Sequence, residues 1–432
     1  MNNIKNQDQQ TNELVTLFSK GDYRKLINIA EDLIIKFPNN PNYYNLLALA
    51  YKKIGKRDKA EEVFFKIIRK NQKNPKIAFI YSNCANLFYD TGRTEKAIVF
   101  HKASLELDPG NLASSAGIGL ALSSAGRDQE AINFLKKGLK KNNDDPKVND
   151  IIAQSYRKIE KHRQAIEHYT KSNSRLSQSY KLECMYISIK TDSDKKNFHD
   201  FLDELNNSSF SDPLVSCISS HSSIRFSNSD NCNFCKKPFD YIKKNNLFNN
   251  NDFNENLIEQ FLLDIKESGI NQKAQALLNN GLQTSGNIFN LEYKSVKKMK
   301  EIIIDNIQSY RNSYKNSDSD FIKLWPKNFL IFGWLISLKK GGNLDPHMHK
   351  EGWLSSSIYL KLPNKNNDEG NIKFSLNGAG YETDGVDNYP EKIIDLSLGD
   401  MVMFPSSIFH STIPFSSDEN RITLAFDTIP QL

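Results

Sequence analysis

Three histidines and one arginine near the end of the chain have the types and spacing of residues that could form a reactive centre. His347 and His349 lie two residues apart, and His410 lies on a later segment. Because side chains at i and i+2 of a strand point the same way, His347 and His349 can address one point. His410 can then supply a third ligand from another strand. Imidazole is a common ligand of transition metals, so this pattern predicts a metal centre.

Arg421 follows His410 and begins the segment RITLAFDTI (421–429), whose residues alternate cleanly. Arg421, Thr423 and Ala425 fall on one face of the expected strand, and apolar side chains occupy the other. A guanidinium in such a strand needs an anionic partner, and a carboxylate matches its paired N–H groups. The segment therefore predicts a binding site for a carboxylate.

Short strands separated by Gly, Asn, Asp and Pro clusters must position these residues. The expected strands are FLIFGWLISL (329–338), LSSSIYLKL (354–362), NIKFSL (371–376), KIIDLSL (392–398), MVMF (401–404) and RITLAFDTI (421–429). Helical patterns at 255–267 and 291–314 precede them. Evenly spaced short strands over about a hundred residues suggest a jelly roll or a small barrel.

Three motifs carry a resemblance to a known family. They are GGNLDPHMHKEGWLSSSIYLKLP (341–363), GDMVMFPSSIFHSTIPF (399–415) and NRITLAF (420–426). The segment from about 325 to 430, with a helical lead, resembles the Fe(II)- and 2-oxoglutarate-dependent oxygenases, especially a bacterial and phage branch related to prolyl hydroxylases. The resemblance implies a double-stranded β-helix (jelly roll) that binds Fe(II), the cosubstrate 2-oxoglutarate and O2, and that hydroxylates a substrate.

The resemblance also implies roles for individual residues. His347 and His410 fall on positions of metal ligands. Arg421 and Thr423 fall on the positions that hold the distal carboxylate of 2-oxoglutarate, and Tyr359 is a further contact to the cosubstrate. Beyond the metal centre, no other catalytic side chain is expected.

One position departs from the pattern of the superfamily, which has Asp or Glu where this chain has His349. The usual non-haem Fe(II) site has two histidines and one carboxylate. We favour His347, His349 and His410 as the three ligands, because the 2-oxoglutarate dianion would balance the metal charge. The alternative is that Asp345 supplies a carboxylate ligand. Asp345 could instead accept a hydrogen bond from a ligating histidine and so fix its tautomer without binding the metal itself.

The first half of the chain repeats with a period near 34 residues. The turn position of each unit is held by Gly21, Gly55, Gly92, Gly126 and Glu160, and five residues later four units carry Ala60, Ala97, Ala131 and Ala165. A helix, a tight turn and a second helix form each unit, and units must stack because one hairpin cannot bury its own apolar face. The pattern resembles tetratricopeptide repeats, about five of them.

Such an array predicts a binding surface on the first helix of each unit. By register we place Asn45, Asn86, Tyr89, Gln154 and Arg157 in its concave groove. The expected ligand is a protein or a peptide.

The expected organisation is a multidomain α + β chain. A tetratricopeptide solenoid covers 9–175, a helical cap and connector covers 176–250, and an oxygenase-like domain covers 251–432 with its jelly-roll core at about 325–430. The connector contains Cys232 and Cys235 in CNFC, a single C-x-x-C that is a weak metal signal without a second pair.

Composition narrows the class of protein. The 57 basic and 51 acidic side chains leave a formal charge of +6, too dilute over 432 residues to predict a nucleic-acid partner. The longest apolar run is too short for a membrane span, and the first residues carry no secretory signal. Five cysteines scattered along the chain fit reduced thiols. We therefore expect a cytoplasmic protein without membrane or nucleic-acid partners.

The leading interpretation is a hydroxylase whose repeat array recruits the substrate. One alternative is a non-catalytic repeat adaptor with a degenerate oxygenase fold. The other is a cupin-like dioxygenase that uses three histidines and no 2-oxoglutarate. Arg421 disfavours this last alternative, since such a site needs no carboxylate anchor.

Overall fold

The computed structural model describes residues 2–139, 145–208, 210–364 and 366–431. The chain divides into two compact units, Met1–Cys184 and Met185–Leu432, which are described separately. The boundary falls inside helix α11 (Arg175–Ile187). Among the described residues, no helix combines the length and the apolar character needed to cross a membrane.

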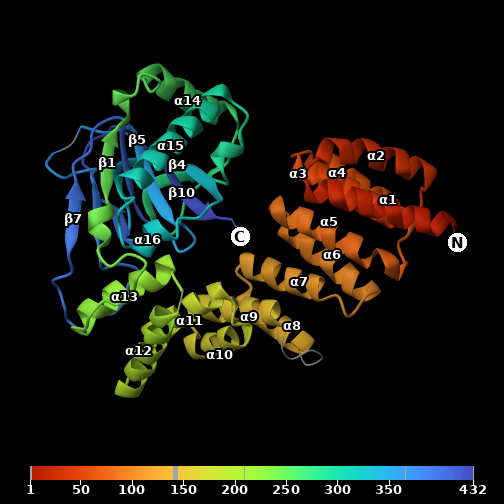
Figure 1. Ribbon diagram of the computed structural model, residues 1–432, viewed down its shortest axis with the longest axis horizontal. Coiled ribbons are helices and arrows are strands. Elements are labelled where there is room, and N and C mark those ends of the chain that lie inside the picture. The colour runs from red at the N-terminus through yellow and green to blue at the C-terminus, as the bar shows by residue number, and fades with distance from the viewer. Residues whose placement is uncertain (1, 140–144, 209, 365, 432) are drawn as a thin grey trace. The chain divides into compact units, whose positions relative to one another are not determined.

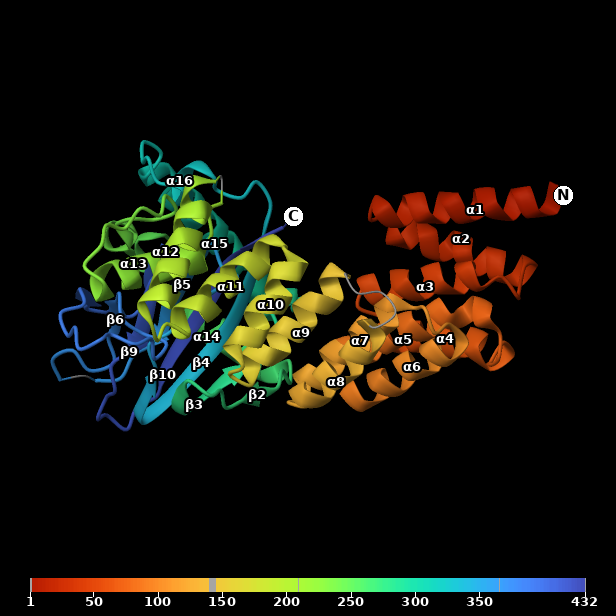
Figure 2. The ribbon, with the colours of Figure 1, turned by 90° about the horizontal axis from the view of Figure 1, so that it is seen from below.

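The first unit is built of helices that pack in antiparallel pairs (Figures 1 and 2). Its helices are α1 (Asn2–Ser19), α2 (Tyr23–Lys36), α3 (Pro41–Lys53), α4 (Arg57–Lys70), η1 (Pro75–Ile77), α5 (Ala78–Asp90), α6 (Thr94–Leu107), α7 (Leu112–Ser124), α8 (Asp128–Leu139), α9 (Pro146–Lys158) and α10 (His162–Ser172). Pro41 and Pro146 each open a first helix behind a capping Asn40 or Asp145.

The turn position of each repeat has the backbone conformation that its sequence predicts. The four turn glycines have φ between 74° and 78°, and Glu160 has φ 58° in the same left-handed region. One hydrogen bond closes each turn; in the second repeat Lys56 N donates to Tyr51 O at 2.9 Å. The four alanines after the turns are fully buried, so the second helix approaches the first closely.

The second unit contains two antiparallel sheets. Its strands are β1 (Lys243–Asn246), β2 (Gln272–Lys273), β3 (Leu278–Thr284), β4 (Phe329–Leu344), β5 (Leu354–Lys361), β6 (Ile372–Ser375), β7 (Glu391–Ile394), β8 (Asp400–Pro405), β9 (Phe409–Thr412) and β10 (Arg421–Pro430). The larger sheet has the order β1-β8-β5-β10-β4-β3-β2, and the smaller sheet has the order β7-β6-β9. Two facing antiparallel sheets confirm the expected jelly roll.

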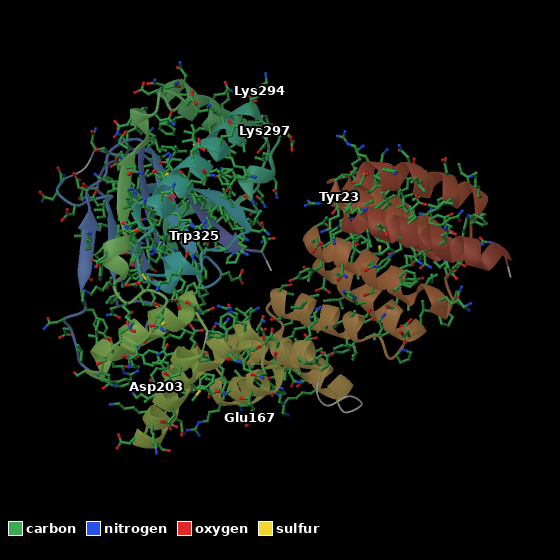
Figure 3. The ribbon with its side chains drawn as sticks, in the orientation of Figure 1. Tyr23, Glu167, Asp203, Lys294, Lys297 and Trp325 are labelled. Atoms are coloured by element: carbon green, nitrogen blue, oxygen red, sulfur yellow. The ribbon has the colours of Figure 1, made fainter. Side chains whose placement is uncertain are left out.

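Helices and short 3-10 turns complete the second unit. They are α12 (Asp192–Asn207), α13 (Pro213–Arg225), η2 (Pro238–Tyr241), η3 (Leu247–Asn249), α14 (Glu255–Glu267), η4 (Ile288–Asn290), α15 (Lys294–Ser313) and α16 (Asp320–Lys323). Trp325, which follows α16, packs on Tyr310 of α15, while Lys294 and Lys297 lie in the first turn of that helix (Figure 3). Trp353, next to β5, donates its indole N–H to the carbonyl of Phe321 at 2.8 Å. These contacts attach the helical lead to the larger sheet.

A buried aromatic and aliphatic core joins the two sheets. Tyr359 of β5, Phe404 of β8 and Phe374 of β6 belong to one cluster and are at most 1% exposed. Phe374 and Phe404 meet edge to face, with ring centroids 4.8 Å apart. The candidate site lies beside this core, between the sheets.

Candidate metal centre

Backbone pairing brings the three histidines together. His347 lies between β4 and β5, and its N–H donates to the carbonyl of His410 at 3.1 Å, while His410 N–H donates back at 2.9 Å. His349 N–H donates to the carbonyl of Ser406, which precedes β9. These bonds hold the histidine pair against β9. One nitrogen from each ring lies within 4.8 Å of the other two.

Each imidazole has a hydrogen-bond acceptor beside its Nδ1 atom. The acceptor is the carbonyl of Asp345 for His347 (2.8 Å), the carboxylate of Asp427 for His349 (2.6 Å) and the carbonyl of Ile408 for His410 (3.4 Å). A carbonyl or a carboxylate accepts but does not donate, so we assign the proton of each ring to Nδ1. The Nε2 lone pairs are then free to bind a metal.

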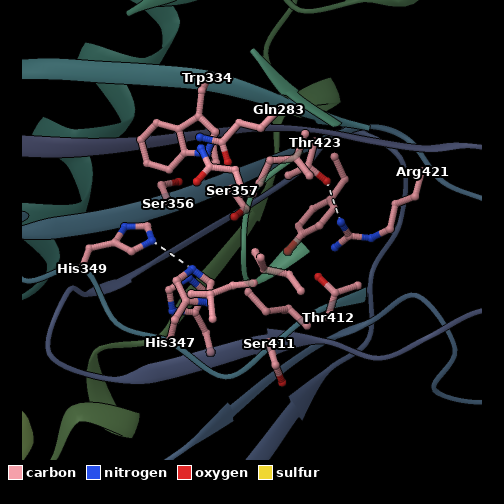
Figure 4. Close-up of a pocket in the computed structure, with 18 of the residues that line it drawn as sticks. Gln283, Trp334, His347, His349, Ser356, Ser357, Ser411, Thr412, Arg421 and Thr423 are labelled. Atoms are coloured by element: carbon pink, nitrogen blue, oxygen red, sulfur yellow. Dashed lines mark hydrogen bonds between the residues drawn. The ribbon is translucent and has the colours of Figure 1, made fainter. Parts of the chain in front are cut away.

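The geometry of these lone pairs fits a cation. The Nε2 atoms of His347 and His349 face each other at 3.2 Å (Figure 4). With both protons on Nδ1, no hydrogen remains between these two nitrogens, and their lone pairs would repel unless a positive charge lies between them. Three converging nitrogens with their protons directed outward form a donor set that could hold a transition metal.

Burial keeps two of the rings neutral. Desolvation, reinforced by the neighbouring His349, lowers the pKa of His347 to about 4. Desolvation, followed by the effects of His347 and His349, holds the pKa of His410 well below its ordinary value. Metal ligation requires neutral imidazole, so these rings are ready to bind without losing a proton.

The side chain of Asp345 turns away from the metal centre. Its carboxylate accepts hydrogen bonds from Asn343 Nδ2 at 2.8 Å and from Asn279 Nδ2 at 3.2 Å. Asp345 contributes its backbone carbonyl, which orients His347. The alternative that this carboxylate binds the metal directly therefore has no support in the geometry.

Asp427 is the carboxylate that contacts the centre, and sequence reasoning missed it. It lies on β10, where its Oδ1 accepts from His349 Nδ1 at 2.6 Å and from Ser355 Oγ at 2.7 Å. The alternation that grouped Arg421, Thr423 and Ala425 places residue 427 on the same face two positions later. Following the alternation to the end of the strand would have found it.

Arg421 forms the other end of the site. The residue is 3% exposed; its Nε donates to the carbonyl of Gly370 at 2.9 Å and its Nη1 to Thr423 Oγ1 at 2.8 Å (Figure 4). Among the described residues, no carboxylate lies within ion-pair distance of the guanidinium. Desolvation lowers the pKa of Arg421. A buried guanidinium without an anion is costly, so this geometry favours an anionic ligand.

Tyr359 lies beside this guanidinium, which sits 5.0 Å from the centroid of the tyrosine ring. The Tyr359 hydroxyl is buried and has no hydrogen-bond partner of good geometry among the described residues. Burial raises the pKa of Tyr359 to about 12, so the hydroxyl remains a donor. A buried unpaired donor next to a buried unpaired cation is suited to bind a carboxylate.

One cavity of about 360 Å³ connects the histidine cluster with the arginine end. The larger sheet provides Trp334 and Ile336, and the smaller sheet provides Ile372 and Thr412. Arg421 is the one Lys, Arg, Asp or Glu among the described lining residues, and neutral polar side chains such as Gln283, Ser356 and Thr412 also line the cavity. The cavity thus has the three imidazoles at one end and the guanidinium at the other.

The five groove residues lie on the first helices of their repeats, in α3, α5 and α9. Asn45 accepts a hydrogen bond from Asn83 Nδ2 at 2.8 Å, and Gln154 Nε2 donates to Asp150. Arg157 pairs with Glu183 at 3.3 Å. Asn86 is exposed and Tyr89 is half-buried.

Cys232 and Cys235 are buried free thiols. Burial raises the pKa of Cys232 to about 12. The metal-ligand types in the described part of the chain gather in a group of three only at His347, His349 and His410. The C-x-x-C segment thus forms no metal centre with described residues.

Comparisons with known proteins follow the same division of the chain. Residues 333–427 match a family model described as "Putative 2OG-Fe(II) oxygenase", where 2OG is 2-oxoglutarate. Residues 41–73 and 88–155 match models of the tetratricopeptide repeat. The chain therefore combines tetratricopeptide repeats with a domain of this oxygenase family, as its motifs predicted. No curated protein matches the chain.

Several solved structures are similar to part of the chain. The pilF protein of Pseudomonas aeruginosa is 15% identical, and the match covers 48% of this chain and 93% of that chain with a TM-score of 0.41. A crystal structure of MamA is 19% identical over 36% of this chain and 90% of that chain, with a TM-score of 0.32. The C-terminal part of a TPR repeat-containing protein from Cytophaga hutchinsonii is 18% identical over 49% and 81%, with a TM-score of 0.38.

Proposed function

We propose that this protein is an Fe(II)- and 2-oxoglutarate-dependent hydroxylase whose repeat array recruits a protein or peptide substrate. The observation that carries the proposal is the pairing, in one cavity, of three converging imidazoles with a buried guanidinium that has no carboxylate partner. A metal site alone would not require this cation. A keto acid that binds the metal at one end and carries a carboxylate at the other meets both needs.

His347, His349 and His410 would hold the iron through Nε2. Arg421 and Thr423 would bind the distal carboxylate of 2-oxoglutarate, and the Tyr359 hydroxyl would donate to the same group. Bound iron and keto acid supply the oxidising chemistry with O2, which the side chains themselves lack. The chain's own part is to orient the cosubstrate and to limit the access of water to the cavity.

Anaerobic titration tests the metal and cosubstrate assignments together. Purified full-length protein is titrated with Fe(II) and then with 2-oxoglutarate, and the visible spectrum is recorded. A weak charge-transfer band after the keto acid is expected for wild type. His410→Ala should abolish iron binding, because only two of the three imidazole ligands would remain. Arg421→Ala should keep iron but weaken 2-oxoglutarate binding about 100-fold or more, since a charge-assisted bidentate contact is lost.

The same titration separates the alternatives. Iron binding without a keto-acid band would favour a three-histidine dioxygenase that does not use 2-oxoglutarate. Absence of iron binding would favour the adaptor. Unchanged 2-oxoglutarate affinity in Arg421→Ala would contradict the role of that residue.

Recruitment by the repeats needs its own measurement. Candidate proteins are incubated with enzyme, iron and 2-oxoglutarate, and a mass increase of one oxygen is scored on each protein together with succinate formation. The double variant Asn86→Ala/Tyr89→Ala should reduce substrate-stimulated succinate formation. Glu167→Ala, an exposed change on the second helix α10, is the matched control. Equal stimulation in wild type, the double variant and the control would contradict substrate binding by the groove residues.

A further inference from the structure

The three imidazoles differ in what holds them. His347 and His410 donate their Nδ1 protons to neutral backbone carbonyls, whereas His349 donates to the carboxylate of Asp427 at 2.6 Å. His349 is also the position where the superfamily pattern carries a carboxylate ligand. The only acidic side chain that contacts a ring of the cluster, among the described residues, thus lies directly behind the substituted ligand.

We infer that Asp427 supplies through His349 the negative charge that a carboxylate ligand would otherwise give the metal. This inference rests on the metal site of the proposed function. Asp427 is a positioning residue, because it touches the ligand and not the metal. A carboxylate that accepts the far N–H of a ligating imidazole makes that ring a stronger donor to the metal.

Orienting the ring would not by itself require this charge. Ser355 Oγ lies 3.1 Å from the same Nδ1 atom and could accept its proton, as the carbonyls do for the other rings. Instead, Ser355 Oγ lies 2.7 Å from Asp427, where it can donate, and 2.8 Å from Ser406 Oγ. A buried carboxylate loses more hydration free energy than a neutral acceptor in the same place. This cost is offset if the charge interacts favourably with a nearby cation. The geometry therefore favours an electrostatic role.

The surrounding backbone holds Asp427 in this place. Asp427 pairs with Ser355 across β10 and β5, in an unshifted part of the register. Gly352 packs so closely that a Cβ there would lie 2.7 Å from Ser406 Oγ and 3.2 Å from Asp427 Cγ. Strand pairing and close packing thus limit the carboxylate to the position beneath His349.

Iron affinity of the full-length protein gives the first test. The dissociation constant of Fe(II) is measured anaerobically without 2-oxoglutarate, by competition with a chromophoric chelator. Asp427→Asn keeps an oxygen acceptor and a similar shape but removes the charge, so affinity should fall about 10- to 100-fold. Asp264→Asn, a buried carboxylate on α14 that accepts from Ser295, is the matched control and should bind like wild type.

A double-variant cycle separates charge from structural support. In His349→Asp the ligand itself carries a negative charge, so the charge of Asp427 becomes largely redundant for the metal. Asp427→Asn should therefore weaken iron binding much less in the His349→Asp background than in wild type. A merely structural role of Asp427 predicts the same weakening in both backgrounds.

Nitrogen NMR of the metal-free protein supplies a readout independent of iron. Asp427→Asn should shift the Nδ1 resonance of His349 and leave those of His347 and His410 near their wild-type positions. Thermal unfolding of each variant checks that the fold is retained.

The outcomes are distinct. If wild type binds no iron, the proposed function and this inference both fail. If wild type binds iron and Asp427→Asn binds it within twofold, the inference alone fails. If Asp345→Asn weakens binding as much as Asp427→Asn, the charge is not specific to Asp427 and the inference also fails.

Discussion

At the scale of single residues, the candidate site consists of side chains that, in the part of the chain described, lack a hydrogen-bond or ion-pair partner on the side that faces the cavity. Among the described residues, each of the three histidines has a hydrogen-bond acceptor at Nδ1 and, with the tautomers assigned above, no hydrogen-bond donor at Nε2. Arg421 has two neutral acceptors and no carboxylate in the described chain. Buried polar groups normally have hydrogen-bond or ion-pair partners, so these unpaired groups indicate which parts of a ligand would contact them.

Tyr359→Phe tests whether the unpaired Tyr359 hydroxyl contributes to binding of 2-oxoglutarate. Among the described residues the hydroxyl has no hydrogen-bond partner of good geometry, so its removal should leave the metal-free protein as stable as wild type or slightly more stable. Affinity for 2-oxoglutarate should fall about tenfold, because one hydrogen bond to a carboxylate is worth about 1.5 kcal/mol. Keto-acid titration and thermal unfolding measure the two effects. A loss of stability with unchanged affinity would contradict this role.

At the scale of elements, strand β10 links both ends of the cavity. Arg421 and Thr423 at its start form the guanidinium end of the cavity, and Asp427 near its end contacts His349 of the histidine cluster. The strand pairs with β4 and with β5, so both of its edges are held. Central placement in the larger sheet gives its side chains the rigidity that a two-ended ligand requires.

The repeat array depends on small residues at close helix contacts. Gly117 of α7 faces His101 of α6, and a Cβ at Gly117 would lie 2.2 Å from the Nε2 atom of that ring. Gly117→Ala should lower the free energy of unfolding by about 1–3 kcal/mol through overpacking. Gly110→Ala is the control, because its nearest contact is 3.4 Å. Equal thermal midpoints for the two variants would contradict the close contact.

The same histidine predicts how the array responds to pH. Burial lowers the pKa of His101 to about 4, against an unfolded value of 6.5. The unfolded chain therefore binds the proton first, and stability is full above about pH 6.5 and is lost as the pH falls toward 4. The loss amounts to about 3 kcal/mol at most. Denaturant unfolding at several pH values measures it, and His101→Leu should reduce the slope in part, because burial also lowers the pKa of His168 to about 4. If His101→Leu leaves the pH dependence of the unfolding free energy unchanged, His101 is not its source.

At the scale of the whole molecule, the repeats and the cavity lie in different units. The residues that line the cavity belong to Met185–Leu432, and the repeats belong to Met1–Cys184. Metal and cosubstrate should therefore stabilise the second unit directly.

Hydrogen exchange can resolve this effect by region. At 100 times its dissociation constant, a ligand adds about 2.7 kcal/mol to the stability of the unit that binds it. Fe(II) with 2-oxoglutarate, added without O2, should slow exchange in β4, β5, β8 and β10. The helices α2 to α10 should exchange at unchanged rates. Equal slowing in both units would contradict separate roles.

The sequence predicted well what depends on local order. The period near 34 identified the repeats because each turn and each alanine acts within its own helix pair. The 255–267 helix agrees with α14 for the same reason. The predicted strands lacked β9 (Phe409–Thr412), since all four of its residues are buried and two are hydroxyl residues, so no alternation marks it. β3 was also missed because Asn and Gly interrupt it.

The sequence by itself determined the repeat array, a run of short strands, and a histidine pair with a partner that could meet it. These follow from periodicity, which one chain segment carries alone. Only the tertiary structure decided which carboxylate contacts the histidine cluster. Asp345 is two residues from His347 but directs its carboxylate to asparagines, whereas Asp427 is 78 residues from His349 and contacts its ring. Strand pairing sets that contact, and pairing between distant strands cannot be derived from local spacing.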